Sequence, residues 1–380
     1  MSANLGDLLE GLRALIVNWP NLIMMAVGGL LIYLAIAKET EPVLLLPIGI
    51  GAVIGNLPLS AMVDPDEVGN LLYVIRVAGL DNELFPLLIF IGVGAMMDFR
   101  PLLAQPLFAL LGAAGQFGIF GTLLAAILLG FEMNQAASIG IIGAIDGPTS
   151  IYVASTLAPE LLAIISVVAY SYMSLVPIIQ PPIMRLLTTR EERMTHMEYT
   201  PRPVSSLVVV AFPVIVTIAI GILVPRAAPL IAALMIGNLL KESGVVQRLV
   251  HASENEIINV TTLFLGLVVG SLMTAESFLR WDTLMILVLG LFAFGLDTVA
   301  GLLFGKVLYV LSGKRINPLI GAAGISAFPM AGRIVQRVAQ EEDFSNFVLM
   351  HAMAANTAGQ LGSVIAGGVL LTLVLPMVGG

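Results

Sequence analysis

The chain has 380 residues, of which 58 % are hydrophobic and 11 % charged, and its mean hydropathy is +1.00. Soluble domains carry about 25 % charged residues, so this composition indicates a polytopic membrane protein whose solvent is the lipid bilayer. The net charge of −8 speaks against a nucleic-acid partner. The absence of cysteine excludes disulfides and thiolate metal sites.

In chain order, residues 5–17 are expected to form an amphipathic helix at the membrane interface. A full span needs about 20 residues, and several of the apolar stretches that follow are long enough. Others, such as 84–97 and 227–240, are short or interrupted, which fits either re-entrant helices or poorly delimited spans. The expected apolar stretches are 20–37, 42–62, 84–97, 106–131, 135–157, 160–187, 204–224, 227–240, 257–274, 283–311, 316–335 and 346–378.

Two polar stretches interrupt this pattern. Residues 63–83 are acidic, whereas residues 185–202 carry four arginines, which predicts a cytoplasmic location for the second stretch. We therefore expect an N-terminal repeat over 1–190, a basic cytoplasmic linker over 191–203 and a C-terminal repeat over 204–380.

Three short strings support a repeat. Residues 51–58 resemble 233–240 at an offset of 182, and 89–97 resemble 265–273 at an offset of 176. The third pair matches Pro148 with Pro329 at an offset of 181. The predicted fold is an all-α membrane protein of two inverted repeats, with broken or re-entrant helices near the membrane midplane.

Asp146, in GAIDGPTSIY (143–152), is the outstanding polar position. It lies in an apolar stretch, and no basic residue occurs between Arg100 and Arg185. Ionisable groups at membrane depth are costly and are functional candidates, and Gly147 and Pro148 favour a helix break that frees carbonyl oxygens. With the Thr149 hydroxyl, Asp146 is expected to bind Na⁺ or H⁺. The alternative is a helix cap.

The matching segment NPLIGAAGISAFPMAGR (317–333) is polar at Asn317, Ser326 and Arg333. The first two side chains offer oxygens to a cation. Arg333 is expected to hold an anionic substrate or to balance Asp146, the alternative being a snorkelling residue at a helix end.

The last segment of each half also carries polar groups. Tyr172 and Asn356 lie at roughly matching points, and Tyr170 precedes Tyr172 by two residues. Helix–helix hydrogen bonding is the alternative for these positions. Asp297 is expected to be either a second proton or ion group or a residue that faces a polar cavity.

These strings, together with AYSYMSLVPIIQPPIMRLLT (169–188) and KESGVVQRL (241–249), resemble the membrane β subunit of the sodium-pumping, biotin-dependent decarboxylases. The family includes oxaloacetate, methylmalonyl-CoA and glutaconyl-CoA decarboxylases. The resemblance implies decarboxylation of carboxybiotin, proton consumption and Na⁺ export across a bacterial or archaeal cytoplasmic (inner) membrane.

The resemblance also implies roles for single residues. It assigns Na⁺ binding to Asp146, Thr149, Asn317, Ser326 and Asn356. It assigns catalysis to Asp146, Arg333 and Tyr172, and carboxybiotin handling or coupling to Arg333, Tyr170 and Gly321.

The resemblance further implies partners: a biotin carrier protein, a carboxyltransferase α subunit, a small accessory subunit and assembly as a homotrimer. Na⁺ is then the transported ion, and biotin arrives on a partner. The alternative is a Na⁺- or H⁺-coupled secondary transporter of a small organic anion, which needs no biotin carrier. The sequence names neither the acid that is decarboxylated nor the number of spans.

Overall fold

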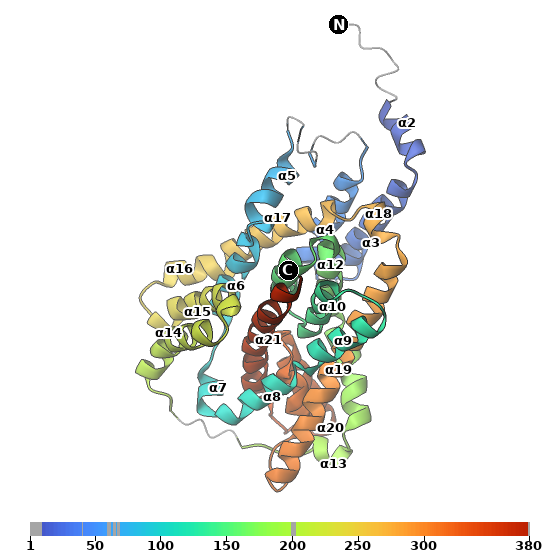
Figure 1. The fold of residues 1–380 in the computed structure, drawn as a ribbon. Coiled ribbons are helices and arrows are strands. Elements are labelled where there is room, and N and C mark those ends of the chain that lie inside the picture. Colours follow the sequence, from blue (N-terminus) through green and yellow to red (C-terminus); the bar gives the residue numbers. More distant parts are fainter. Residues whose placement is uncertain are drawn as a thin grey trace.

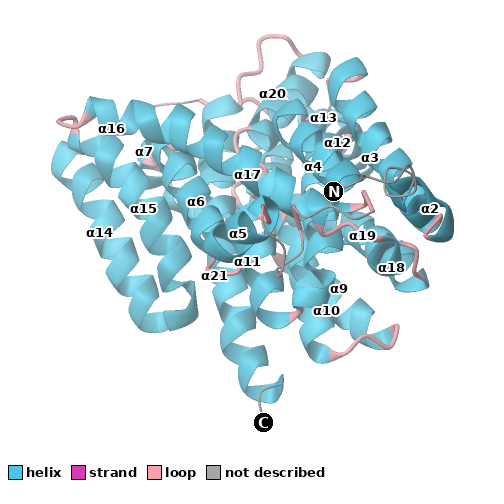
Figure 2. Ribbon diagram, turned by 90° about the horizontal axis from the view of Figure 1, so that it is seen from above, coloured by secondary structure: helices cyan, strands magenta, loops and turns pink. Residues whose placement is uncertain are grey.

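The computed structural model describes residues 10–39, 41–58, 62–63, 66, 69–198 and 203–378. Every regular element in these ranges is helical (Figure 2), which confirms the all-α class. A bent helix, α12 (Leu162–Leu187), turns by 61° near residue 174 and is a candidate for a sixth span. Five described helical runs are long and apolar enough to cross a membrane: α3 (Pro20–Ala37), Pro106–Leu128, α14 (Ser206–Leu223), α19 (Trp281–Leu311) and α21 (Leu349–Val378).

Several of the short apolar stretches form helices of 13 to 16 residues. They are α4 (Pro42–Gly55), α6 (Leu84–Met96), α15 (Ala228–Ser243) and α17 (Ile258–Ser271). The N-terminal helix α2 covers Glu10–Val17, and residues 5–9 of the predicted interfacial helix lie outside the described residues.

One layer of the molecule is a row of six helices. Each packs on the next in the order α3, α4, α17, α6, α15, α14, and Figure 1 shows α14 and α15 at one side with α3 and α4 at the other. The matched strings pair α4 with α15 and α6 with α17. If each helix is replaced by its matched helix in the other half, the same row is obtained in the reverse direction. A two-fold relation between the repeats requires this order.

Two asparagines make equivalent contacts in this row. Asn56, at the end of α4, donates from Nδ2 to the carbonyl oxygen of Met273 at 2.7 Å. Asn238, in α15, donates from Nδ2 to the carbonyl oxygen of Met97 at 3.1 Å. Each asparagine and each methionine occupies the matching place in its string. These contacts support a repeat, and its inverted orientation stays a prediction.

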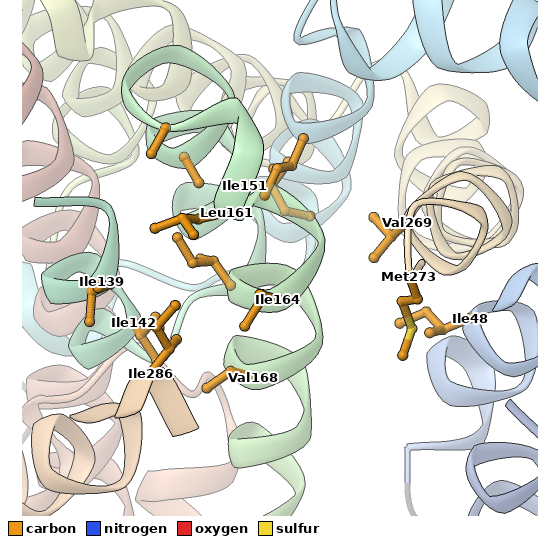
Figure 3. Close-up of a cluster of buried hydrophobic side chains, with 14 of the residues drawn as sticks. Ile48, Ile139, Ile142, Ile151, Leu161, Ile164, Val168, Val269, Met273 and Ile286 are labelled. Atoms are coloured by element: carbon orange, nitrogen blue, oxygen red, sulfur yellow. The ribbon is translucent and has the colours of Figure 1, made fainter. Parts of the chain in front are cut away.

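The second layer contains the other long helices and the broken segments. Here α12 packs on α19 and α11 (Gly147–Leu157), and α21 packs on α11 and α20 (Met330–Glu342). Figure 3 shows Ile142, Val168 and Ile286 pointing toward one another from three of these segments, apart from Ile48 at the side of α4. Buried aliphatic side chains therefore fix the bundle around the breaks.

Both predicted breaks are present. The first follows α10 (Met133–Gly140) and the 3-10 turn η3 (Ile141–Ala144), and it ends where α11 begins. Ile145 lies there at φ 54°, a left-handed conformation that is rare for a β-branched residue. The second break separates the 3-10 helix η7 (Pro318–Gly324) from α20. The Ser326 amide donates to the Ala144 carbonyl oxygen at 3.4 Å, so the two breaks touch.

The basic linker lies on the C-terminal end of α20. The side chain of Arg193 donates from Nε to Glu342 at 2.8 Å and from Nη1 to the carbonyl oxygen of Thr188 at 2.5 Å. The bond from Arg193 lowers the pKa of Glu342. His196 contacts Asp343 at 2.7 Å. The cytoplasmic location of this end, which the positive-inside rule predicts from the arginines, stays a prediction.

The contact between the linker and α20 is expected to depend on pH. Hydrogen bonds from the hydroxyl and amide of Ser345, together with His196, lower the pKa of Asp343 to about 2. The ordinary pKa of an aspartate is about 4, so the lowered pKa of Asp343 stabilises the contact at every pH above about 4. This stabilisation is lost as the pH falls through about 2. Pepsin cleavage within 189–198 should therefore increase from pH 4 to pH 2. Asp343→Asn should already be cleaved rapidly at pH 4, and equal cleavage of both proteins at pH 4 would contradict the expectation.

Candidate ion site at two helix breaks

Asp146 lies at the N-terminus of α11 with its side chain 5 % exposed. Its Oδ1 accepts from the amide of Thr149 at 3.4 Å, so the helix cap is present. Its Oδ2 accepts from the Thr149 hydroxyl at 2.6 Å, from Gln360 Nε2 at 2.7 Å and from the Ser363 hydroxyl at 2.9 Å. Three donors on one oxygen suit an ionised carboxylate, because hydrogen bonds to a charged acceptor are stronger than those to a neutral one.

The Asp146 carboxyl group has no basic counter-charge among the described residues. No ion pair joins this carboxylate to a basic side chain within the described residues. Neutral donors favour the ionised form, but a buried charge without a partner of opposite sign remains costly. The arrangement is therefore suited to a small cation next to the carboxylate.

The second break contributes further oxygens. Asn356, on α21, donates from Nδ2 to the Ile325 carbonyl oxygen at 2.6 Å. Its Oδ1 is buried and has no partner among the described residues. Ser326 donates to the Gly359 carbonyl oxygen at 2.9 Å. Asn356 and Ser326 thus lie together at the break that touches Ala144, and their role as Na⁺ ligands stays a prediction.

Gln116 ties three segments together beside these breaks. It lies at the turn between α8 (Ala109–Ala114) and α9 (Phe117–Leu128). Its Nε2 donates to the carbonyl oxygens of Gly112 at 3.0 Å, of Gly324 at 3.3 Å and of Gly359 at 3.3 Å. This side chain therefore fixes the second break against α8 and α21.

The two tyrosines of α12 have different surroundings. The partly buried ring of Tyr170 packs against Gly147, directly after Asp146, and its hydroxyl has no partner in the described part of the chain. The Tyr172 hydroxyl donates to the Leu287 carbonyl oxygen of α19 at 2.5 Å. The structure therefore places Tyr170, and not Tyr172, beside the carboxylate.

Asn317 lies at the far end of η7. Its Nδ2 donates to the carbonyl oxygens of Arg193 and Thr195, both at 2.9 Å, and its Oδ1 accepts from the Leu319 amide at 3.0 Å. Seven residues at about 2 Å per residue separate it from the second break. The structure does not bring Asn317 to Asp146, and here its side chain holds the linker.

Gly321 packs against α19. A Cβ atom at this position would overlap the carbonyl oxygen of Gly301. The backbones of η7 and α19 approach each other only because both positions are glycine. In this structure Gly321 is therefore a packing residue.

Arg333 lies on the exposed face of the amphipathic helix α20, with Arg337 one turn further on. The opposite face buries Ile334, Val335 and Val338. No ion pair of Arg333 occurs within the described ranges, whereas the basic linker pairs with the acidic residues at the other end of α20. Arg333 is thus available to a partner or substrate and is not a counter-charge of Asp146.

The partners Gln360 and Ser363 were not among the predicted site residues. They lie four and seven positions after Asn356, so the three side chains share one face of α21. That spacing in an apolar helix is a signal for a polar face. It does not say what the face contacts, because Asp146 lies more than 200 residues away.

Gln360→Leu is expected to weaken Na⁺ binding about 10–100-fold, the usual cost of losing a group that orients an ion ligand. The maximal rate at saturating Na⁺ should change little. The matched control is Gln180→Leu, because Gln180 is also buried but donates to the Ala322 carbonyl oxygen at 2.8 Å. Equal Na⁺ dependence of the two variants would remove Gln360 from the site.

The fold and the site together define an all-α membrane protein in which two broken helices meet at a buried carboxylate. The family model described as "Na+-transporting oxaloacetate decarboxylase beta subunit" matches residues 20–374. The chain belongs to this family.

Relatives from three kinds of decarboxylase are similar along most of the chain. The glutaconyl-CoA decarboxylase subunit beta of Acidaminococcus fermentans is 50 % identical over 94 % of each chain. The methylmalonyl-CoA decarboxylase subunit beta of Veillonella parvula is 50 % identical over 93 % of each. The oxaloacetate decarboxylase beta chain 2 of Salmonella typhimurium is 44 % identical over 98 % of this chain and 100 % of its own. These relatives favour a decarboxylase subunit over a secondary transporter.

Proposed function

We propose that this chain releases CO₂ from carboxybiotin and couples this step to Na⁺ export, as the membrane subunit of a Na⁺-pumping decarboxylase. The observation that carries the proposal is the buried Asp146 carboxyl group at the contact between two helix breaks, where one oxygen accepts three hydrogen bonds and no described basic side chain pairs with it. A transported Na⁺ would supply the missing positive charge. Membership of the Na⁺-transporting family supports the same ion.

The Na⁺ ion would be held by oxygens of both breaks. Asp146 supplies the charge and Thr149 a hydroxyl, while Ser326 and Asn356 supply neutral oxygens from the second break. Such an oxygen set suits a hard cation. The Oδ1 of Asn356 is the ready ligand, because it has no partner within the described residues. Asn317 would act at the cytoplasmic end of the protein, where its side chain holds the linker.

The chemical step breaks the bond between the ureido nitrogen of biotin and the carboxyl carbon. The bonding electrons stay on nitrogen, which takes up one proton, and CO₂ leaves. The exposed guanidinium of Arg333 would receive the carboxylate of the approaching substrate, because arginine matches a carboxylate with two parallel donors. Tyr170, against Gly147, is placed to link events at the substrate with Asp146.

A route for the ion away from the linker begins at the other end of α11. Two cavities of about 430 Å³ and 420 Å³ share Glu160 and Ser277 in their linings. The first is also lined by Glu132, Asp282 and Arg280, and the second by Asp81, Glu83 and Arg76, so carboxylates outnumber arginines in both. An acidic cavity attracts cations, so Na⁺ would leave the protein on this side. Movement of the second layer against the six-helix row would alternate access.

The proposal needs partners. A biotin carrier protein would deliver carboxybiotin, a carboxyltransferase α subunit would load it, and a small accessory subunit and two further copies of this chain would complete the complex. The complex would reside in the cytoplasmic membrane of a bacterium or archaeon. The carboxyltransferase would then determine which acid is decarboxylated, because this chain would receive only carboxybiotin.

The presence of a biotin carrier separates the proposal from a secondary transporter. The chain purified in detergent should decarboxylate free carboxybiotin faster with Na⁺ than with K⁺, and a biotinylated carrier should bind to it. Arg333→Ala should lower the rate mainly through a higher KM, whereas Arg315→Ala, an exposed arginine outside α20, should leave it unchanged. Absence of any Na⁺-stimulated CO₂ release would contradict the proposal.

A further inference from the structure

A second carboxyl group is buried in the interior of the bundle. Asp297 lies in the middle of α19 with 0 % of its side chain exposed. Its Oδ1 accepts from the amide of Gly118, in the first turn of α9. Its Oδ2 has no partner among the described residues. Asp146 and Asp297 are the buried carboxyl groups of the described chain that have no basic partner, whereas the buried Glu242 side chain pairs with Arg100. They differ in their number of donors: four bonds reach Asp146 and one reaches Asp297.

No charged group within the described residues balances Asp297. The elements α8, α9, α10, η3 and η7 pack on α19 and contain no titratable side chain. Helix α12 presents Tyr170, Tyr172 and Arg185, and Arg185 pairs with Glu341 at the linker end. On α19 itself, Lys306 pairs with Glu192. A buried carboxylate with one donor and no cation is strongly disfavoured, so the neutral acid is the form that these surroundings favour.

The other half of the chain shows what this position requires. The offset of 181 that matches Pro148 with Pro329 also matches Gln116 with Asp297 and Gly143 with Gly324. Gln116 donates to the Gly324 carbonyl oxygen at the second break. Asp297 lies against Gly143 at the first break, where a Cβ atom on the glycine would lie 3.1 Å from Oδ2.

The same place in the two halves is therefore occupied by an amide and by an acid. An amide always has N–H groups to donate to the carbonyl oxygens of a break, whereas a carboxyl group can donate only when it is protonated. An asparagine would donate permanently. An aspartic acid adds one property, which is that its proton can leave.

A proton suits Asp297 better than a metal ion does. Na⁺ and other hard cations need several oxygen ligands. No cluster of three or more acidic or histidine side chains occurs among the described residues, and no second carboxyl group contacts Asp297. One carboxyl oxygen is enough to hold a proton.

We propose that Asp297 is a proton-binding site whose protonation depends on the position of the first break. Its carboxyl group is protonated while Gly143 packs against α19. When this contact opens, the acid gives its proton to entering water and becomes a carboxylate, and it takes a proton from water before the contact closes again. The role of this proton in transport rests on the proposed function, whereas the protonation itself does not.

Infrared difference spectroscopy of the complete complex in lipid tests the protonation. Wild type at neutral pH should show a buried carboxylic-acid band that shifts in D₂O and is lost in Asp297→Asn. Asp282→Asn is the matched control, because it makes the same change at the exposed end of α19. Asp146→Asn should keep the band. If Asp297→Asn does not accumulate, the band in Asp146→Asn decides, since Asp297 is then the remaining buried carboxyl group of the described chain without a basic partner. Absence of the band in Asp146→Asn, or its presence in Asp297→Asn, would overturn the proposal.

Steady-state kinetics tests the role in transport. Asp297→Asn keeps an acceptor for Gly118 and a donor toward the break, so a purely structural role predicts the rate and pH profile of wild type. A proton-binding role predicts at least a tenfold lower Na⁺-dependent rate and loss of one step in the pH profile. A profile like that of wild type would overturn the transport role. If wild type itself shows no Na⁺-dependent decarboxylation, the proposed function fails, and the infrared result still decides the protonation.

Discussion

Asp146→Asn is expected to abolish Na⁺-dependent decarboxylation while the protein stays folded and inserted in the membrane. The change removes the charge that would balance Na⁺. Loss of an outer partner of an ion ligand costs roughly 10–100-fold in affinity, and loss of the charged ligand itself should cost more. Decarboxylation of carboxybiotin measured against Na⁺ concentration checks the expectation.

The folded state should tolerate this change. The amide oxygen of an asparagine can take the place of Oδ2 and accept from Thr149, Gln360 and Ser363. The variant then loses only the 3.4 Å bond from the Thr149 amide, which caps α11. The thermal unfolding temperature should therefore stay close to that of wild type. Normal Na⁺ stimulation in the folded variant would exclude Asp146 from the mechanism.

Gly321→Ala is expected to destabilise the protein by about 1–3 kcal/mol or more, the usual cost of overpacking a core. The new methyl group would overlap the carbonyl oxygen of Gly301, and a backbone atom cannot move aside as a flexible side chain can. Thermal unfolding in detergent measures the effect. Activity should be lost in proportion to folded protein, because Gly321 acts through packing.

Gly295→Ala is the matched control for this variant. Gly295 lies on α19, as Gly301 does, but a Cβ atom there meets nothing within 4 Å. Alanine is favoured over glycine within a helix by about 1 kcal/mol, so this control should be as stable as wild type or more stable. If Gly321→Ala unfolds at the wild-type temperature but has lost activity, the residue acts on the chemistry and not through packing.

Much of this fold could be predicted from hydropathy. The stretch 20–37 coincides with α3, and the interrupted stretches 135–157 and 316–335 contain the two breaks. Glycine and proline mark these places because they remove or loosen the backbone bonds of a helix. The meeting of the breaks was not predictable from the spacing alone. It depends on the bond between Ser326 and Ala144, which are distant in the sequence.

The site was predictable where a residue is exceptional for its surroundings. Asp146 is a lone acid in an apolar stretch, so the cost of burying its charge identifies it. Gln360 and Ser363 are ordinary helix–helix polar residues until the structure brings them to that acid. Asn317 followed from the match between the two halves and from the resemblance. Only the structure places it beside the linker, because the sequence does not say which end of η7 faces the other break.

The most direct test of the central claim uses the complete complex in sealed vesicles with the linker side outward. Addition of carboxybiotin on the biotin carrier should start ²²Na⁺ uptake together with CO₂ release, and Asp146→Asn should lose both. Matched CO₂ release and Na⁺ movement in wild type is the result that a decarboxylase pump predicts. Na⁺ movement that carboxybiotin does not change would contradict it and would favour a secondary transporter.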